Sequence, residues 1–184
     1  MANVFTVYRP FLSFLLRFIV SYAALAFLYQ GYLLQYDSSQ KEVDYITYQV
    51  AEQSKWVLQF FDETAYTAPN PKEAGIKLFY HNTWIARIIE GCNAVSVMIL
   101  FAAFVVAFRG TWQRTLWFIP LGIGIIHLAN ILRIALLAIA LYHFPTYEHA
   151  LHGVLFPMVI YGIVFLLWMA WVNYFSKYAG PSKK

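Results

Sequence analysis

Four long apolar stretches alternate with more polar segments along the chain. They cover residues 11–34, 88–108, 116–142 and 152–174. Because about 20 apolar residues suffice to cross a bilayer, each stretch is long enough to be a transmembrane helix. The first stretch exceeds the apolar core of a cleavable signal peptide, roughly 7–15 residues, so we expect it to be retained. The pattern predicts an all-α integral membrane protein with four transmembrane helices, forming a single membrane domain over residues 1–184.

The segment 36–87, between the first two apolar stretches, is predicted to be an outer loop that contains an amphipathic helix. Apolar residues recur in it at helical spacing, namely Val43, Ile46, Val50, Val57 and Phe61, with Trp56 and Phe60 widening the stripe. Asp37-Ser38-Ser39 is a plausible helix start, and Pro69-Asn70-Pro71 ends the helical pattern. This helix is expected to lie on the membrane surface or to pack on the bundle. Residues 74–84 fit a strand, a strand pair or an irregular approach to the next helix.

Composition agrees with a membrane protein, because 61% of the residues are hydrophobic and 12% are charged, against about 25% charged in soluble domains. The distribution of charge explains the net charge of +4 without a nucleic-acid partner. Segment 36–87 has seven acidic and five basic residues, and segment 143–151 has no Lys or Arg. The other basic residues near the predicted span ends are Arg9, Arg17, Arg109, Arg114, Lys177, Lys183 and Lys184. The positive-inside rule then predicts cytoplasmic termini and two extracytoplasmic loops.

Three residues of chemical interest fall in the outer half of the predicted membrane domain. Arg133 lies inside the third apolar stretch, where a charge costs roughly 2.5–3.5 kcal/mol on insertion scales and marks a functional site by default. Cys92, the only cysteine, is expected about one turn inside the second span. His149 precedes the fourth span. A thiolate nucleophile, an imidazole base and a guanidinium that stabilises an oxyanion together support acyl transfer.

The residues around these three positions resemble the exosortase/archaeosortase family of membrane cysteine transpeptidases, most closely its short type F members. The resemblance rests on Glu90-Gly91-Cys92-Asn93-Ala94-Val95, Asn130-Ile131-Leu132-Arg133-Ile134 and His149-Ala150-Leu151-His152-Gly153-Val154-Leu155-Phe156. Many members follow the cysteine with Ser/Thr-Gly, where this chain has Asn93-Ala94. The family pattern has glycine four residues after its histidine, and Gly153 gives His149 that spacing.

The resemblance implies that Cys92 is the nucleophile, Arg133 the stabiliser of oxyanion or thiolate, and His149 the general base. Its substrates would be secreted proteins with a C-terminal motif, a transmembrane helix and a basic tail, cut at the outer face of the bacterial cytoplasmic membrane. The new C-terminus would pass to an unidentified acceptor, and no cofactor is implied.

Three further residues are expected to support this site. Asn130, three residues from Arg133, is placed to orient the guanidinium. Glu90 is expected to pair with Arg87 or with Arg133, and His152 competes with His149 as base. The histidines lack an H-E-x-x-H or H-x-x-E-H spacing, so no metal site is predicted. The alternative function is a non-catalytic membrane subunit of a transporter or polysaccharide-export system, in which Arg133 is a binding or structural charge.

Overall fold

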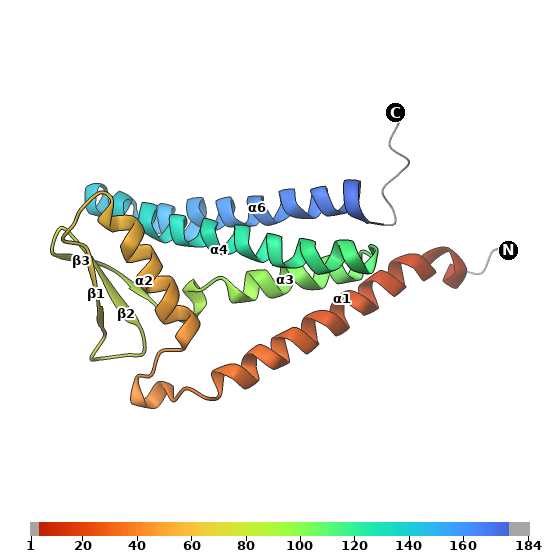
Figure 1. The fold of residues 1–184 in the computed structure, drawn as a ribbon, viewed down its shortest axis with the longest axis horizontal. Coiled ribbons are helices and arrows are strands. Elements are labelled where there is room, and N and C mark those ends of the chain that lie inside the picture. The colour runs from red at the N-terminus through yellow and green to blue at the C-terminus, as the bar shows by residue number, and fades with distance from the viewer. Residues whose placement is uncertain (1–3, 177–184) are drawn as a thin grey trace.

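The computed structural model describes residues 4–176, so that Lys177, Lys183 and Lys184 lie outside the described residues. Four apolar helical segments lie side by side, and a small sheet with one further helix covers one end of the bundle (Figure 1). We call this end the sheet end. The opposite end, where the first helix begins and the last helical turn finishes, is the termini end.

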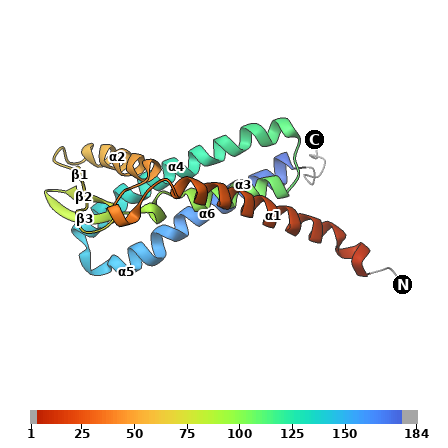
Figure 2. The same ribbon diagram turned by 90° about the horizontal axis from the view of Figure 1, so that it is seen from below.

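The bundle helices follow one another in alternating directions between these two ends. They are α1 (Val4–Leu33), α3 (Val95–Ala107), α4 (Trp112–His143) and a C-terminal segment built from α5 (Glu148–Ala150), the π-helical turn η4 (Leu151–Leu155), α6 (Phe156–Ala170) and the π-helical turn η5 (Trp171–Phe175). A 3₁₀ turn, η3 (Pro145–Tyr147), joins α4 to α5. Helix α1 packs on α3, α3 packs on α4, and α4 packs on α6. Figure 2 shows α5 at the sheet end.

Within the described residues, three helical segments are long and apolar enough to cross a membrane: Tyr8–Leu33, Trp112–His143 and Pro145–Phe175. The predicted second span is shorter than expected. Residues 88–94 form the end of a strand and a turn, and the apolar helix that follows, α3, has 13 residues. It rises about 20 Å, less than the roughly 30 Å of a hydrocarbon core. The structure thus supports a multi-pass membrane protein, and the count of four spans stays a prediction.

Helix α4 is longer than a bilayer requires. Its 32 residues correspond to about 48 Å, against a hydrocarbon core of about 30 Å. At the sheet end, Ile134, Ala135 and Ala138 of α4 are buried against the sheet and the helix that covers it. The sheet-end part of α4 is therefore packed within the layer that α2 and the sheet form. Arg133 directly precedes this packed part of α4.

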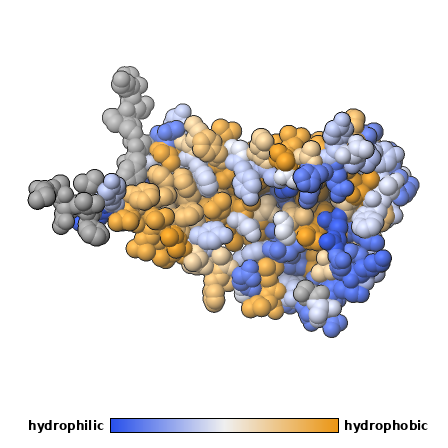
Figure 3. All heavy atoms as spheres, turned by 180° about the vertical axis from the view of Figure 1, so that it is seen from behind, coloured by the Kyte–Doolittle hydropathy of each residue, from blue (hydrophilic) through white to orange (hydrophobic). Residues whose placement is uncertain are grey.

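The surface agrees with this division. Figure 3 shows apolar residues over much of the bundle and hydrophilic residues gathered at the sheet end. Large apolar side chains of α1 and α6 are exposed, with Phe27 at 79%, Leu28 at 68% and Leu166 at 63%. Such a surface is stable against lipid and unstable against water, which places the bundle in the membrane.

The predicted amphipathic helix is present as α2 (Tyr45–Gln59). It starts later than Asp37-Ser38-Ser39 because that region forms only a 3₁₀ turn, η1 (Ser38–Gln40). The carboxylate of Asp44 instead caps α2, accepting a hydrogen bond from the N–H of Thr47 at 3.0 Å. Val50 is fully buried, whereas Trp56 and Phe60, expected to widen the apolar stripe, are exposed. Helix α2 packs against α4 and the sheet.

A three-stranded antiparallel sheet occupies the region that the sequence left undecided, so the prediction of an all-α fold is wrong there. Its strands are β1 (Tyr66–Pro69), β2 (Ile76–Tyr80) and β3 (Thr83–Ile88), in the order β1-β2-β3. Residues Ile76, Leu78 and Tyr80 alternate as buried positions, as a half-buried strand requires. His81 and Asn82 have φ values of 48° and 57° and form the tight turn between β2 and β3.

Asp62 supports this turn from the loop after α2. One of its carboxylate oxygens accepts a hydrogen bond from the N–H of His81 at 2.7 Å, and the other accepts one from the N–H of Thr64 at 3.0 Å. Burial raises the pKa of Asp62, but the hydrogen bonds from His81 and Thr64 outweigh it, so the pKa lies below its ordinary value. The resulting stabilisation is present at neutral pH and is lost as the pH falls through this lowered pKa.

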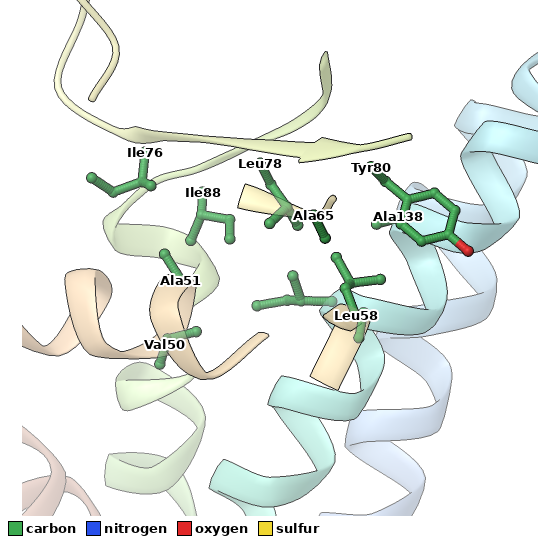
Figure 4. Packing of buried hydrophobic residues seen from close by; sticks show 11 residues of the cluster. Val50, Ala51, Leu58, Ala65, Ile76, Leu78, Tyr80, Ile88 and Ala138 are labelled. Atoms are coloured by element: carbon green, nitrogen blue, oxygen red, sulfur yellow. The ribbon is translucent and has the colours of Figure 1, made fainter. Parts of the chain in front are cut away.

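A hydrophobic core fills the space between α2, the sheet and the sheet-end part of α4. Figure 4 shows Val50 and Leu58 of α2 pointing toward Leu78 and Ile88 of the sheet, with Ala138 of α4 closing the side. These five side chains are 0–2% exposed. This core fixes the sheet, and the turn that follows β3, relative to α4.

Gly122 makes the close contact between α3 and α4 possible, and its replacement is expected to destabilise the bundle. A Cβ atom there would lie 2.2 Å from Cζ of Phe101, which is fully buried. Gly122→Ala should therefore cost about 1–3 kcal/mol through overpacking, measured as a lower thermal unfolding temperature in detergent. A Cβ at Gly124 meets nothing within 4 Å, so Gly124→Ala is the matched control and should not lower stability. Equal effects of the two substitutions would contradict this packing.

Candidate active site

Cys92 lies in a turn between the sheet and the bundle, not inside a transmembrane helix as expected. The turn is the 3₁₀ helix η2 (Glu90–Cys92), which follows β3 directly and precedes α3. The N–H of Cys92 donates to the carbonyl of Ile89 at 2.8 Å. The thiol is free and the residue is partly buried. A short turn with its own hydrogen bonds thus presents the thiol at the sheet end of the bundle.

Asn130 holds this turn against α4. Its Nδ2 donates to the carbonyl oxygen of Cys92 at 2.8 Å, and the residue is fully buried. Sequence reasoning expected Asn130 to orient the guanidinium of Arg133, whereas the observed bond fixes the backbone of the cysteine. The spacing of the two residues on one helix was informative, but it did not reveal that the amide reaches another element.

Asn93 connects the same turn to two further helices. Its Nδ2 donates to the hydroxyl of Tyr29 at 2.9 Å and to that of Thr47 at 3.1 Å. Its Oδ1 accepts from the N–H of Val95 at 2.9 Å, at the start of α3. The next residue, Ala94, is left-handed with φ 62°, a conformation that favours glycine. An alanine thus holds a left-handed position directly after the turn that carries Cys92.

Glu90 is held by α1. Its carboxylate accepts a hydrogen bond from the hydroxyl of Tyr29 at 2.8 Å. The expected ion pair between Arg87 and Glu90 is wrong, because Arg87 pairs with Glu73 instead. Arg87 belongs to β3, whose extended backbone does not bring residues i and i+3 onto one face, whereas the sequence argument assumed a helix. Glu90 thus supports the Cys92 turn through Tyr29.

Arg133 and Cys92 line the same cavity, which has a volume of about 360 Å³. The cavity is bounded by β3, by α4 and by the helical segment that begins after η3. Its lining residues are Trp84, Ile85, Ala86, Arg87, Ile88, Ile89, Cys92, Arg133, Ile134, Leu137, Leu141, Glu148 and His152. The Nε of Arg133 is buried without a hydrogen-bond partner, as is Oδ1 of Asn130. Buried polar atoms without a hydrogen-bond partner are rare in folded proteins and often mark functional sites.

The two candidate histidines differ in their position relative to this cavity. His152 lines it together with Glu148, whereas His149 is not among its lining residues. Residues four apart lie on one face of a helix, so Glu148 and His152 project together, while His149 is turned by about 100° from Glu148 and by about 60° from His152. Both histidines are exposed. The cavity thus brings together Cys92, Arg133 and His152.

Two components of the cavity were missed by sequence reasoning. The first is the run of six consecutive residues from Trp84 to Ile89, five from strand β3 and one directly after it. The second is the carboxylate of Glu148. The four-residue spacing of Glu148 and His152 could have indicated that Glu148 lies beside the candidate base.

Within residues 4–176, no three His, Cys, Asp or Glu side chains are grouped so as to hold a metal ion.

Asn93→Ala is expected to be among the most destabilising polar substitutions near the site. It leaves the hydroxyl of Thr47 and the N–H of Val95 without their partners in a buried region, where each such loss costs about 1–3 kcal/mol. We expect a total loss of about 2–3 kcal/mol, measured by thermal unfolding in detergent. Asn173, at an exposed position of η5, provides the control, since Asn173→Ala removes the same groups without a buried network. An unchanged unfolding temperature for Asn93→Ala would show that Asn93 does not hold the turn.

Comparison with known proteins agrees with this architecture. A family model described as transmembrane exosortase matches residues 12–174, a range that runs from α1 to η5 and includes Cys92, Arg133 and both histidines. Searches of curated proteins and of solved structures gave no match. Because the match spans far more than half of the 184 residues, the chain belongs to the transmembrane exosortase family.

Proposed function

We propose that the protein is a membrane cysteine peptidase and transpeptidase that cuts C-terminal sorting signals from secreted proteins. Membership in the exosortase family supports a membrane protein-sorting enzyme in general. The observation that carries the specific proposal is the single cavity lined by Cys92, Arg133 and His152. These residues come from a turn, from α4 and from η4, and they supply the three groups that acyl transfer needs.

The reaction follows from the chemistry of these groups. The imidazole takes the thiol proton, and the sulfur of Cys92 attacks the carbonyl carbon of the scissile peptide bond. The oxyanion that forms is stabilised by the guanidinium of Arg133, whose Nε has no other partner. The C–N bond then breaks, the imidazolium gives its proton to the leaving amine, and a thioester remains on Cys92. An acceptor nucleophile attacks this thioester, loses its proton to the imidazole and releases the thiol.

The distribution of charge supports an active site that faces out of the cytoplasm. All nine acidic residues lie at the sheet end: Asp37, Glu42, Asp44, Glu52, Asp62, Glu63, Glu73, Glu90 and Glu148. Arg109 and Arg114 flank the connection between α3 and α4 at the termini end. Because short cytoplasmic segments carry an excess of Lys and Arg, we place the termini end in the cytoplasm and the sheet end outside, in the cytoplasmic membrane of a bacterium. The proposed substrates carry a C-terminal motif, a transmembrane helix and a basic tail. We also propose that the protein is one of the short type F members of the exosortase family.

The experiment that tests this function compares cells that contain the protein with cells in which its gene is deleted. Mass spectrometry of membrane and secreted fractions would give the C-termini of proteins that end in a transmembrane helix and a basic tail. We expect new C-termini before the helix only when the protein is present, and full-length, membrane-retained forms in the deletion strain. Identical C-termini in both strains would reject the proposal. They would favour the non-catalytic membrane subunit.

A further inference from the structure

Strand β3 has a free edge. In the described part of the chain the sheet order is β1-β2-β3, and β3 pairs with β2 only. An edge strand presents unpaired N–H and C=O groups along one side, which another extended chain can use. The edge strand at the other side of the sheet, β1, has no part in the cavity that contains Cys92.

The free edge of β3 forms one wall of the active-site cavity. Every residue from Trp84 to Ile89 lines it. Successive side chains of a strand point to opposite faces, so a cavity in contact with six consecutive residues runs along the edge of the strand. The facing wall is α4, which contributes Arg133, Ile134, Leu137 and Leu141, spaced as one helical face.

A second cavity, of about 310 Å³, extends this space toward the tip of the β2–β3 hairpin. It is lined by Thr83, Tyr142 and Pro145 and shares Trp84, Ile85, Leu141 and Glu148 with the first cavity. Together the two cavities form a groove along the whole of β3, which we call the β3 groove. One side of the β3 groove offers backbone hydrogen-bonding groups and the other is largely apolar, and its inner end reaches Cys92.

We propose that the substrate segment before the scissile bond binds in the β3 groove as an added fourth strand of the sheet. The proposal rests on the proposed function and specifies how that enzyme recognises its substrate. An extended peptide satisfies both walls, because its backbone pairs with the strand edge while alternate side chains meet α4. A helical segment has no free backbone groups to offer to β3. The sorting motif is therefore read in extended form, before the substrate's transmembrane helix begins.

The direction of the added strand follows from the course of β3. The ring of Tyr80, beside the hairpin turn, lies 5.5 Å from that of Tyr142 near the outer end of α4. The other end of β3 leads to Cys92, whose carbonyl is bonded to Asn130, 12 residues or about 18 Å further down the helix. A secreted substrate enters the membrane with its C-terminal end, so its peptide descends from the tip toward Cys92. The added strand thus runs parallel to β3.

The length of the paired segment is limited by an irregularity in β3. The pairing of β2 with β3 shifts register between Leu78 and Phe79, opposite Ile85, and the indole N–H of Trp84 already donates to the carbonyl of Ala86 at 3.0 Å. The regular stretch next to Cys92 extends from Arg87 to Ile89, and Ile89 keeps an extended backbone, with φ −120° and ψ 174°. The substrate strand therefore pairs through about three residues immediately before the cut, which matches a short recognition motif. The substrate residues before these three continue along the β3 groove past Trp84, which lines both of its cavities.

Site-specific photocrosslinking tests the location. The probe is a tail-bearing secreted protein that accumulates uncut in cells with the Cys92→Ala variant, which retains the β3 groove but not the thiol. Benzoylphenylalanine is introduced into that variant at Trp84, which lines the groove and is 54% exposed, or at Tyr66, on the opposite edge strand and 41% exposed. We expect the crosslink from position 84 and at most a trace from position 66. Equal crosslinks from both, or none from position 84, would overturn the proposal.

Backbone methylation tests the strand pairing. Synthetic peptides copied from the residues before the observed cut are N-methylated at odd or at even positions, and their inhibition of cleavage by the wild-type enzyme is measured. In a strand pair, alternate residues direct their N–H groups to the partner. One series should thus lose inhibition by roughly 3- to 10-fold per blocked bond while the other is unaffected. Equal loss in both series would reject strand addition.

The two proposals fail in different ways. If tail-bearing proteins are cut equally in the presence and absence of the protein, the proposed function fails and no substrate exists to crosslink. If cutting depends on Cys92 but the crosslink is absent at position 84, or methylation shows no alternation, only strand addition fails.

Discussion

Replacing Cys92 with alanine is expected to abolish processing of tail-bearing secreted proteins while the protein stays folded and inserted. The sulfur is the atom that would form the thioester, and no serine, threonine or second cysteine is among the residues that line the cavity. Enzymes that lose a covalent nucleophile typically lose a factor of about 10⁴ or more in rate. The measurement is the rate at which new C-termini appear, followed by mass spectrometry with purified enzyme in lipid vesicles.

The fold is expected to survive this change for a local reason. The bonds that hold the turn use the backbone of Cys92, namely its N–H to Ile89 and its carbonyl from Asn130, so they do not depend on the thiol. Ser96 is exposed in the first turn of α3, and Ser96→Ala serves as the matched control with normal activity. A folded Cys92→Ala variant with substantial cleavage would reject the thioester mechanism. The alternative, a non-catalytic subunit, predicts tolerance of Cys92→Ala and sensitivity at Arg133.

Much of the architecture was predictable from hydrophobic pattern. Long apolar runs predicted α1, α4 and the C-terminal helical segment, and the helical spacing of apolar residues predicted α2. The sheet was not predictable in the same way. Its strands have four to six residues, and a five-residue alternation such as Ile76–Tyr80 is too short to distinguish a strand from an irregular segment.

Part of the site was predictable because Cys92 and Arg133 are unusual in their surroundings. Their placement in one cavity agrees with an inference from depth along two predicted helices. What the sequence did not reveal was the set of partners across elements. Tyr29 donates a hydrogen bond to Glu90, and Asn130 donates one to the carbonyl of Cys92. Arg87 forms its ion pair with Glu73. Such contacts depend on how helices and strands pack, and no spacing within one segment encodes them.

The sequence and the structure favour different histidines, His149 and His152, as the general base. The family spacing to Gly153 favours His149, while the cavity is lined by His152. A general base must come within hydrogen-bond reach of the proton that it takes. Position in the cavity therefore bears more directly on the chemistry than the spacing to a glycine, and we propose His152 as the base in this chain.

His152→Ala is accordingly expected to lower the rate of processing by about 10²- to 10⁴-fold, the usual contribution of a positioned acid–base group. His149→Ala is its matched control: it removes the same ring three residues earlier on the same exposed helical segment, and it should retain most of the wild-type rate. Both variants are assayed with the purified protein in lipid vesicles, over a range of pH. Loss of the general base should also change the shape of the pH–rate profile, which a merely structural defect would leave unchanged.

The opposite pattern, with severe loss in His149→Ala and a nearly normal rate in His152→Ala, would assign the base to His149. It would then follow that η4 rearranges when substrate occupies the cavity. The π-helical turn from Leu151 to Leu155 begins two residues after His149, and turns of this kind are frequent at functional sites. Severe loss in both variants, with the pH dependence unchanged, would reject an imidazole base altogether and leave Glu148, the other titratable group on this wall of the cavity, as the remaining acceptor of the thiol proton.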